Sequence, residues 1–255
     1  MAAAHFIPLS TMRVPQVLIA EKDYLIVYKP PRMHSAPQPR SAETDTLFGW
    51  CAMEFPEVAA LPGRRAGEGG LLHRLDYETQ GLLLVARTQA GMESLLEQQR
   101  KGAMLKEYSA LTASGAALVE GPRQMPGFPA EKPGIREPLP GLRIQSAFRP
   151  YGPGRKAVRP AIAGEQYLTE VLEAHSFAGG LAALRLRIFR GFRHQIRCHL
   201  AWLHMPILND SLYGGAPFGS GLLGLRACSL LFADPASGVE RVFSIPPLEP
   251  GTFFA

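Results

Sequence analysis

A stretch rich in proline and glycine near the middle of the chain constrains the fold more than any other feature. Residues 121–154 hold eight prolines and six glycines. Proline removes a backbone donor and fixes φ, and glycine weakens helices and strands alike, so we expect no regular element there. The helices and strands should therefore lie on either side of these residues, which form an insertion or connector.

Apolar runs, turn residues and helix caps outside this stretch predict a mixed α+β fold. The predicted strands cover residues 17–20, 24–28, 81–87, 104–113, 166–175 and 181–189, with the first two forming a hairpin. The predicted helices cover residues 44–55, with Thr44 or Asp45 near the cap, 89–100 and 192–204. Because strands outnumber helices and adjoin one another in sequence, we expect a mixed, largely antiparallel sheet flanked by helices.

The length and composition are typical of a globular protein. The chain has 255 residues, of which 46% are hydrophobic and 19% charged, enough to build one large core, and a two-part domain would also fit this length. We assign residues 1–16 to an N-terminal extension and residues 17–255 to one domain, which carries the insertion at about residues 121–154.

Basic residues are concentrated in two stretches without any acidic residue. The whole chain carries +5 and these two stretches +10, which leaves −5 for the remainder. Segregated positive charge is expected of a surface that binds a phosphate backbone; an arginine-rich solvated face is the alternative. The basic residues are Arg143, Arg149, Arg155, Lys156 and Arg159 in the first stretch, and Arg185, Arg187, Arg190, Arg193 and Arg197 in the second.

Two spacings within the second stretch predict where its arginines lie. Arg185 and Arg187 alternate with apolar residues along a predicted strand, so one strand face should be buried and the other basic. Arg193 and Arg197 are four residues apart in the helix predicted at residues 192–204, which places them one turn apart.

The cysteines and the hydropathy pattern indicate the compartment. The three cysteines have neither the number nor the spacing of a disulfide framework or a zinc ribbon. No apolar run reaches the ~20 residues of a membrane span. We expect a cytoplasmic protein that is neither exported nor associated with a membrane.

Several chemistries lack their motifs. Dinucleotide and P-loop binding are disfavoured, because neither GxGxxG after the first strand nor GxxxxGK[ST] occurs. His194, His199 and His204 are five residues apart and face different sides of a helix, so we expect no metal site and assign His199 and His204 to packing or the surface. Glu78 is the nearest second carboxylate to Asp76, but alternate residues of a loop need not face the same substrate, so a glycosidase pair is not indicated.

The polar segment at residues 73–80 lies between two apolar runs and is a candidate site. It places the imidazole of His73, the guanidinium of Arg74 and the carboxylate of Asp76 beside a predicted buried strand, where functional loops often lie. In the alternative interpretation, Asp76 caps a turn and Arg74 is solvated.

Several motifs, taken in order along residues 17–247, resemble the RluA family of pseudouridine synthases. Residues 17–19, Asp23 and Lys29-Pro30 are similar to the family's first hairpin. An ordered set of motifs is more specific than any one of them. The others are His73-Arg74-Leu75-Asp76 with Thr79 and Gly81-Leu82-Leu83, Lys106-Glu107-Tyr108, His194-Gln195-Ile196-Arg197, Pro206-Ile207-Leu208-Asn209-Asp210 and Leu212-Tyr213-Gly214.

The resemblance implies an RNA pseudouridine synthase that acts on uridine in structured rRNA or tRNA without a metal or cofactor. The reaction breaks the N1–C1′ bond, turns the uracil and rejoins it through C5. The resemblance makes Asp76 the essential carboxylate, as a nucleophile or a base, with Arg197 as its ion-pair partner. It also places Tyr108 against the uracil, and Arg74 in the space left by the flipped-out base.

The resemblance further implies RNA contacts by His73, Lys106, Arg193, His194 and Gln195. Residues 17–255 then form the catalytic domain, and we expect RNA binding to come from this domain because no S4-type domain precedes the first hairpin. The oligomeric state is left open. The leading alternative is an inactive RNA-binding protein of the same fold; a metal-dependent nuclease would need clustered carboxylates.

Three positions depart from the family's pattern. Gln80 stands in place of the serine of Thr-Ser-Gly, Phe192-Arg193 replaces Arg-Thr before the His-Gln-Ile-Arg motif, and Arg226 stands where histidine is common. These departures bear on substrate contacts more than on the chemistry, because Asp76, Tyr108 and Arg197 all match.

Overall fold

The computed structural model describes residues 5–6, 14–38, 45–63, 65, 67–113 and 140–253. The chain divides into two compact units: Met1–Lys106 with Ala227–Pro246, called the first unit, and Glu107–Arg226 with Pro247–Ala255, called the second unit. No helix among these described residues is long and apolar enough to cross a membrane. The predicted α+β class with a largely antiparallel sheet is confirmed.

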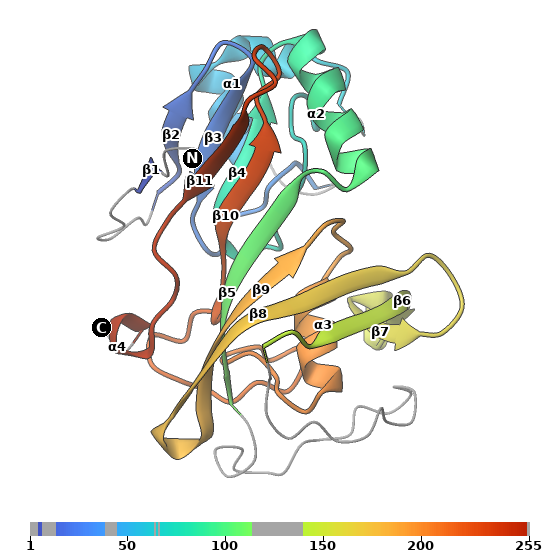
Figure 1. Cartoon of the computed structure of the whole chain (residues 1–255), viewed down its shortest axis with the longest axis vertical. Coiled ribbons are helices and arrows are strands. Elements are labelled where there is room, and N and C mark those ends of the chain that lie inside the picture. Colours follow the sequence, from blue (N-terminus) through green and yellow to red (C-terminus); the bar gives the residue numbers. More distant parts are fainter. Residues whose placement is uncertain are drawn as a thin grey trace. The chain divides into compact units, whose positions relative to one another are not determined.

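Strands of the first unit lie side by side in the order β2, β3, β4 and β10 (Figure 1). Their bounds are Gln16–Ala20, Tyr24–Lys29, Gln80–Ala86 and Leu225–Ala233, the last beginning in the second unit. β11, Glu240–Ser244, pairs antiparallel with β10, and β1, His5–Phe6, pairs parallel with β11. The predicted hairpin is confirmed as β2–β3. Most of the predicted extension at residues 1–16 lies outside the described residues.

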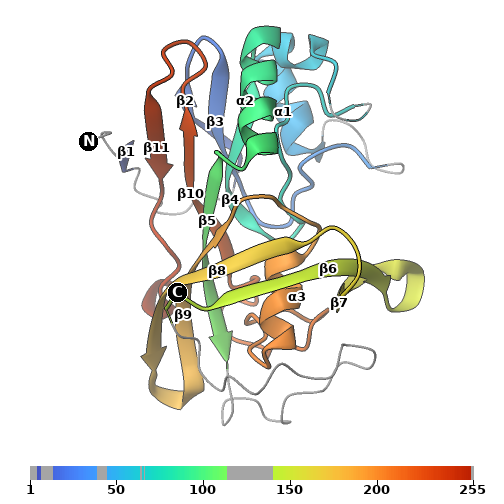
Figure 2. The same ribbon diagram turned by 45° about the vertical axis from the view of Figure 1, so that its right-hand side comes forward.

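Two α-helices of the first unit, α1 at Leu47–Glu54 and α2 at Gln89–Lys101, lie together on one side of its strands (Figure 2). A short 3₁₀ helix, Pro56–Ala60, follows α1. The cap of α1 is Thr46, one residue after Asp45; its backbone is extended and its Oγ accepts the Gly49 N–H at 3.1 Å. α2 begins after Thr88, which caps it in the same way, and ends at the left-handed Gly102.

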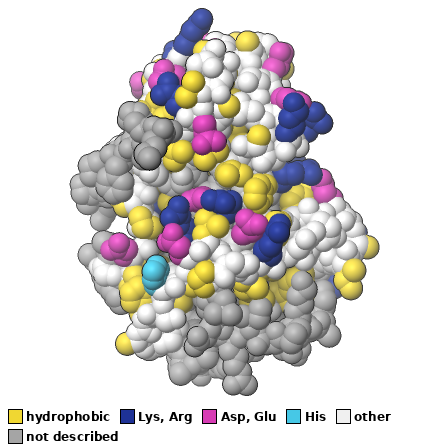
Figure 3. Space-filling model, in the orientation of Figure 1, with side chains coloured by type: hydrophobic (Ala, Val, Ile, Leu, Met, Phe, Trp, Pro, Cys, Tyr) yellow, Lys and Arg dark blue, Asp and Glu magenta, His cyan; other side chains and the backbone are white. Residues whose placement is uncertain are grey.

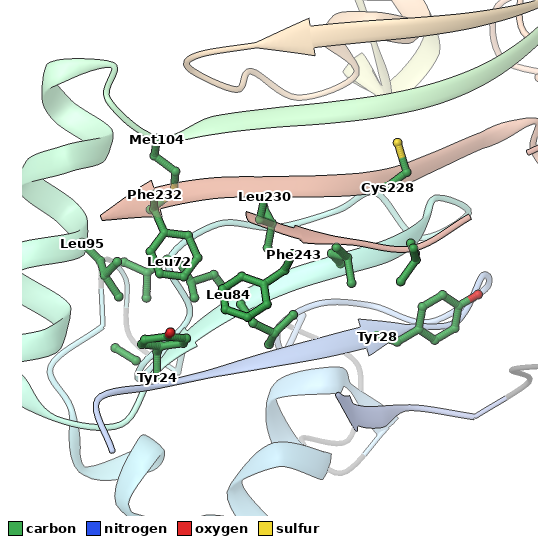
Figure 4. Close-up of a cluster of buried hydrophobic side chains, with 14 of the residues drawn as sticks. Tyr24, Tyr28, Leu72, Leu84, Leu95, Met104, Cys228, Leu230, Phe232 and Phe243 are labelled. Atoms are coloured by element: carbon green, nitrogen blue, oxygen red, sulfur yellow. The ribbon is translucent and has the colours of Figure 1, made fainter. Parts of the chain in front are cut away.

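A hydrophobic cluster in the first unit joins β3, β4, β10, β11 and α2 (Figure 4). The Tyr24 ring meets those of Phe232 and Phe243 edge-on, with centroids 5.1 and 6.1 Å apart. Leu84 and Leu95 are wholly buried in the same cluster. Packing of β4 on both faces therefore holds rigid the strand that follows the candidate loop.

Strands of the second unit follow the order β5, β9, β8, β6 and β7. In that order they cover Leu105–Ala113, Leu181–Ile188, Tyr167–Phe177, Arg143–Tyr151 and Ala157–Ala161. The helices are α3, Gln195–Trp202, which packs against β7 and β8, and α4, Pro250–Phe253; short 3₁₀ helices cover Pro153–Arg155 and Ala178–Gly180.

The expectation of no regular element in residues 121–154 is wrong for its C-terminal part. β6 pairs antiparallel with β8 and then with β7, although residues 114–139 lie outside the described part of the chain. Residues 142–149 contain neither proline nor glycine, so the density averaged over the whole stretch concealed a strand. Pro150 lies near the strand's end, where β6 pairs with β7.

The helix predicted at residues 192–204 is shorter at both ends. His194 has φ +56° and precedes α3, because a left-handed residue cannot continue a helix. Arg193 therefore lies outside the helix and is exposed, whereas Arg197 lies inside it and is 3% exposed. The prediction that these two arginines lie one helical turn apart is wrong.

Candidate active site

Asp76 lies in a loop of the first unit that is held on both sides. Ser35 Oγ donates to the Leu75 carbonyl at 2.8 Å and accepts the Leu75 N–H at 2.9 Å. The Tyr77 carbonyl accepts the Met33 N–H at 3.1 Å. Because the residues before and after it are fixed, the half-buried Asp76 has a defined backbone position, as a preorganised catalytic group needs.

Lys29, the last residue of β3, is a buried cation beside this loop. Its ammonium donates to the carbonyls of Pro30, Met33 and Tyr77 at 2.9, 2.7 and 3.2 Å. Three carbonyl acceptors match the three N–H groups of an ammonium. Burial lowers the pKa of Lys29 to about 7, and the negative charge of Asp76 acts in the opposite direction. The lysine thus stabilises the loop and places positive charge near Asp76.

His73 and Arg74, both predicted to contact RNA, differ in their surroundings. His73 Nε2 accepts the Leu84 N–H at 3.2 Å, which ties the imidazole to β4. The Arg74 side chain is 43% exposed and its Nη1 lies 3.1 Å from Oε1 of Glu68. Of the two, Arg74 is the more exposed.

Gln80, which stands in place of the family's usual serine, lies in the interior of the first unit. Gln80 is 5% exposed, and its Oε1 accepts the Tyr28 hydroxyl proton at 2.8 Å. The next residue, Gly81, has φ +127°, and a Cβ there would lie 2.2 Å from the Ala227 carbonyl oxygen. The segment after Asp76 is therefore fixed by tight packing, and Gln80 serves the fold.

β5 carries two further candidate residues, Lys106 and Tyr108. Lys106 belongs to the first unit and Tyr108 to the second, and both side chains are buried, at 3% and 6% exposure. Alternation along the strand gives them a common face opposite Glu107. Tyr108 therefore presents only a small part of its surface to solvent.

Arg197 forms a buried ion pair in the second unit. Its Nε and Nη2 donate to Oδ2 and Oδ1 of Asp210 at 2.7 and 2.8 Å. The side chains of Arg197 and Asp210 are 4% and 0% exposed. A two-bond fork of this kind fixes the plane of the guanidinium. The pairing of Arg197 with Asp76 implied by the resemblance stays a prediction.

Tyr213 connects this ion pair to His194. The Arg197 guanidinium carbon lies 5.5 Å from the centre of the Tyr213 ring, and His194 Nδ1 lies 3.3 Å from the tyrosine oxygen. The same hydroxyl accepts the Val158 N–H at 2.9 Å. Burial raises the pKa of Tyr213, which keeps the phenol protonated near neutral pH. The left-handed His194 is thereby anchored to the loop that holds Asp210.

Gln195 and Arg193, predicted to contact RNA, occupy different environments. Gln195 is 2% exposed; its Nε2 donates to the Leu168 carbonyl at 2.9 Å and its Oε1 accepts the Phe192 N–H at 3.0 Å. Arg193 is exposed, and its Nη2 donates to the carbonyls of Arg155 and Ala157 at 2.9 and 3.2 Å. Gln195 fixes the loop before α3, and Arg193 joins that loop to β7.

The basic face predicted for β9 is neutralised by carboxylates. Arg185 Nη2 and Arg187 Nη2 lie 2.7 and 2.6 Å from the two oxygens of Glu107, which is 8% exposed, and Arg185 also pairs with Glu173. The burial of the opposite face, with Leu184 and Leu186, is confirmed. Figure 3 shows basic and acidic side chains interspersed over β8 and β9.

The β6–β7 hairpin also carries basic side chains, and their partners differ from those of the β9 arginines. Arg149 and Arg159 are directly opposite each other in the strand register. Among the described residues, no carboxylate lies within ion-pair distance of Arg149, Arg155 or Lys156. Arg155 and Lys156 lie in the turn between the two strands. With Arg149, these cations make the hairpin the better candidate surface for a phosphate backbone.

Sequence reasoning assigned no role to Asp210, Lys29, Ser35 or Glu107. Asp210 had a usable signal: it is the first acidic residue after a run of 36 residues that contains five arginines, and a buried arginine needs a carboxylate. Glu107 had no such signal, because its partners Arg185 and Arg187 follow about 80 residues later in the chain.

Comparisons with a family model, with related sequences and with solved structures all find pseudouridine synthases. A family model described as RNA pseudouridylate synthase matches residues 23–202. Ribosomal large subunit pseudouridine synthase D of Vibrio vulnificus is 28% identical over 247 residues, which cover 91% of this chain and 67% of that protein. The protein of the same name from Xanthomonas campestris is 33% identical over 80% of this chain and 53% of its own length.

A solved structure shares the fold. Human RNA Pseudouridylate Synthase Domain Containing 4 superposes with a TM-score of 0.60 at 19% identity, covering 93% of this chain and 90% of that one.

Proposed function

This chain belongs to the RNA pseudouridylate synthase family, and from that premise we propose that it isomerises uridine to pseudouridine in structured ribosomal RNA. The predicted resemblance to the RluA family is confirmed, and with it the predicted enzyme class. We propose ribosomal RNA as the substrate because the relatives that match most of the chain are named ribosomal large subunit pseudouridine synthases. Transfer RNA, the other substrate implied by the resemblance, is the comparison substrate in the test below.

In this proposal Asp76 is the essential carboxylate. The N1–C1′ bond breaks, the uracil turns, and a C5–C1′ bond forms as C5 loses its proton and N1 gains one. Asp76 acts on the nucleoside as a nucleophile or a base, and either role requires the ionised side chain. The fixed loop and the nearby Lys29 ammonium support this assignment, because they orient and stabilise an anion.

Arg197 and Tyr108 complete the proposed chemistry. Arg197 orients Asp76, and Tyr108 stacks on the uracil or assists a proton transfer. A guanidinium carries five N–H donors, so its fork to Asp210 is compatible with binding a second carboxylate. The protein is proposed to act in the cytoplasm without metal or cofactor.

The proposed RNA contacts divide between exposed and buried side chains. Arg74 and Arg193 are exposed, which suits direct contact, and Arg74 fills the space left by the flipped-out base. The buried Lys106 and Gln195 would act through the fold, whereas His73 and His194 are partly exposed.

The test is to map pseudouridine in ribosomal and transfer RNA from cells with and without this protein, and to repeat the reaction with purified protein. We expect one or more ribosomal sites to lose pseudouridine in the deletion and to regain it in vitro, including with a chelator present. Loss confined to transfer RNA would contradict the proposed substrate, and activity abolished by the chelator would contradict the metal-free chemistry.

A further inference from the structure

Three aromatic rings of the second unit form a cluster beside α3, and two of them are stacked. The Phe148 and Phe192 rings are nearly parallel, with an interplanar angle of 11° and centroids 5.0 Å apart. Tyr167 closes the group, with its ring centroid 5.0 Å from that of Phe192 and 5.9 Å from that of Phe148. The cluster joins β6, β8 and the loop before α3.

Phe192 is the outer ring of this cluster. Phe148 is 4% exposed, whereas Phe192 is 36% exposed. Phe148 is stacked on the Phe192 ring and Tyr167 contacts it at a tilt, yet about a third of Phe192 stays exposed. Part of Phe192 therefore faces solvent at a place where the fold has already stacked another ring against it.

The loop that carries Phe192 is held in place. The backbone N–H of Phe192 donates to Oε1 of the buried Gln195, whose side-chain nitrogen in turn donates to the Leu168 carbonyl. Arg193 is tied to the carbonyls of Arg155 and Ala157. A ligand that stacks on Phe192 would therefore meet a preorganised ring and lose little free energy in ordering it.

The segment that Arg193 binds carries positive charge. Arg193, the residue after Phe192, donates to the carbonyls of Arg155 and Ala157, the residues on either side of Lys156. No carboxylate of the described residues pairs with Arg155, Lys156 or Arg193, whereas Arg190 is paired with Glu165. An exposed aromatic residue next to such cations suits a ligand with a flat π-face and an anionic backbone, as in unpaired RNA.

We propose that the exposed face of Phe192 is a stacking platform for an unpaired base of the RNA substrate, with Arg193 and Lys156 binding adjacent phosphates. This inference rests on the proposed function only in taking RNA as the ligand. Base stacking accepts any base, so the platform contributes affinity and strand placement and leaves sequence choice to other contacts.

The test measures the binding of two probes, a mixed-sequence single-stranded RNA oligonucleotide and heparin, a polyanion without bases. Phe192→Ala should weaken RNA binding roughly tenfold, within a range of about 5- to 100-fold, and leave heparin binding and the salt dependence unchanged. Phe192→Leu should resemble Phe192→Ala, since an aliphatic side chain has no π-face. Phe177→Ala is the matched control: Phe177 is 44% exposed in the same unit and should have no effect.

Phe192→Trp guards against loss of folding in the smaller variants. It should bind RNA as tightly as the wild type, and its fluorescence should be quenched by RNA beyond the change seen in the wild type. Unchanged RNA affinity in Phe192→Ala, equal loss of heparin binding, or full rescue by leucine would overturn the inference. Self-association of the wild type that Phe192→Ala abolishes would assign the ring to a second copy of the chain and overturn it as well.

Failure of this inference is distinguishable from failure of the proposed function. Pseudouridine formation by the wild-type protein tests the function and needs no Phe192 variant. If the wild type turns over RNA but the variants bind RNA normally, only the platform is wrong. If RNA binding depends on Phe192 but no pseudouridine forms, only the function is wrong.

Discussion

The cations of β9 and those of the β6–β7 hairpin lie in the same unit but have different partners. Arg185 and Arg187 bind both oxygens of the nearly buried Glu107. In the hairpin, Arg149 faces Arg159 across the strands, and no carboxylate of the described residues pairs with Arg155 or Lys156. A run of arginines therefore indicates available positive charge only after the acids that other strands bring to it are known.

This difference divides the roles of the arginines. Those of β9 and α3 stabilise the second unit through carboxylates, whereas Arg149, Arg155 and Lys156 of the hairpin have no carboxylate partner among the described residues. Because the electrostatic part of RNA affinity comes from phosphate contacts, we assign most of it to the hairpin.

The largest effect is expected at the most buried ion pair. Arg197→Met leaves the Asp210 carboxylate buried without its partner, which should cost about 3–5 kcal/mol of unfolding free energy. Pseudouridine formation should fall by orders of magnitude if Arg197 also orients Asp76. Arg143→Met, at an arginine with a 65% exposed side chain paired with Glu170, is the control and should cost less than about 1 kcal/mol. A stable, fully active Arg197→Met protein would contradict both roles.

The second effect tests the hairpin directly. Replacing Arg155, Lys156 and Arg159 together by Gln should weaken binding to all RNAs about equally. The slope of log affinity against log salt should flatten by about 0.7 per lost single-strand phosphate contact. The matched control replaces Arg185 and Arg187 by Gln and should leave that slope nearly unchanged. The reverse result would return the RNA-binding role to β9.

A third variant is designed to abolish the difference between the two regions. Glu107→Gln removes the carboxylate that holds Arg185 and Arg187, so their charge becomes available. RNA affinity should rise, and the slope of log affinity against log salt should steepen by the amount expected for up to about two added phosphate contacts. The melting temperature of the variant should be lower than that of the wild type. A variant that binds RNA with the wild-type salt slope would show that these arginines lie away from the RNA.

The smallest effect concerns Lys29, a buried cation held by carbonyl groups. Its pKa is about 7 in the folded protein and near 10.5 in the unfolded chain, so between these values the unfolded state binds more protons and stability rises with pH. Between pH 7 and 9, the unfolding free energy of the wild type should therefore rise relative to that of Lys29→Met. An NMR titration of the Lys29 ammonium checks the same midpoint without a variant, and a midpoint near 10 would contradict it. In Asp76→Asn the midpoint should fall.

Much of the fold follows from local patterns, whereas several contacts of the site do not. The β2–β3 hairpin, β4 and α2 were predictable because turn residues and caps mark their ends. β6 was not, because its pairing with β7 and β8 overrides a local composition that disfavours strands. Likewise, Gln80 and Phe192 were recognisable as departures, but only tertiary packing shows that one is buried and the other exposed.

The site residues divide in the same way. Asp76, Tyr108 and Arg197 were named through ordered motifs, and their catalytic roles stay predictions. The Asp210 fork and the carbonyl cage of Lys29 depend on segments that meet only in the folded units.

The most direct test of the account is the formation of pseudouridine by purified Asp76→Asn protein on ribosomal RNA, measured alongside RNA affinity and melting. The amide keeps the size of the side chain but removes the charge needed for attack or proton abstraction. We predict no detectable pseudouridine from a folded variant that binds RNA nearly as tightly as the wild type, since affinity comes mainly from the hairpin cations. Turnover at the wild-type rate would remove Asp76 from its role and contradict the proposed mechanism.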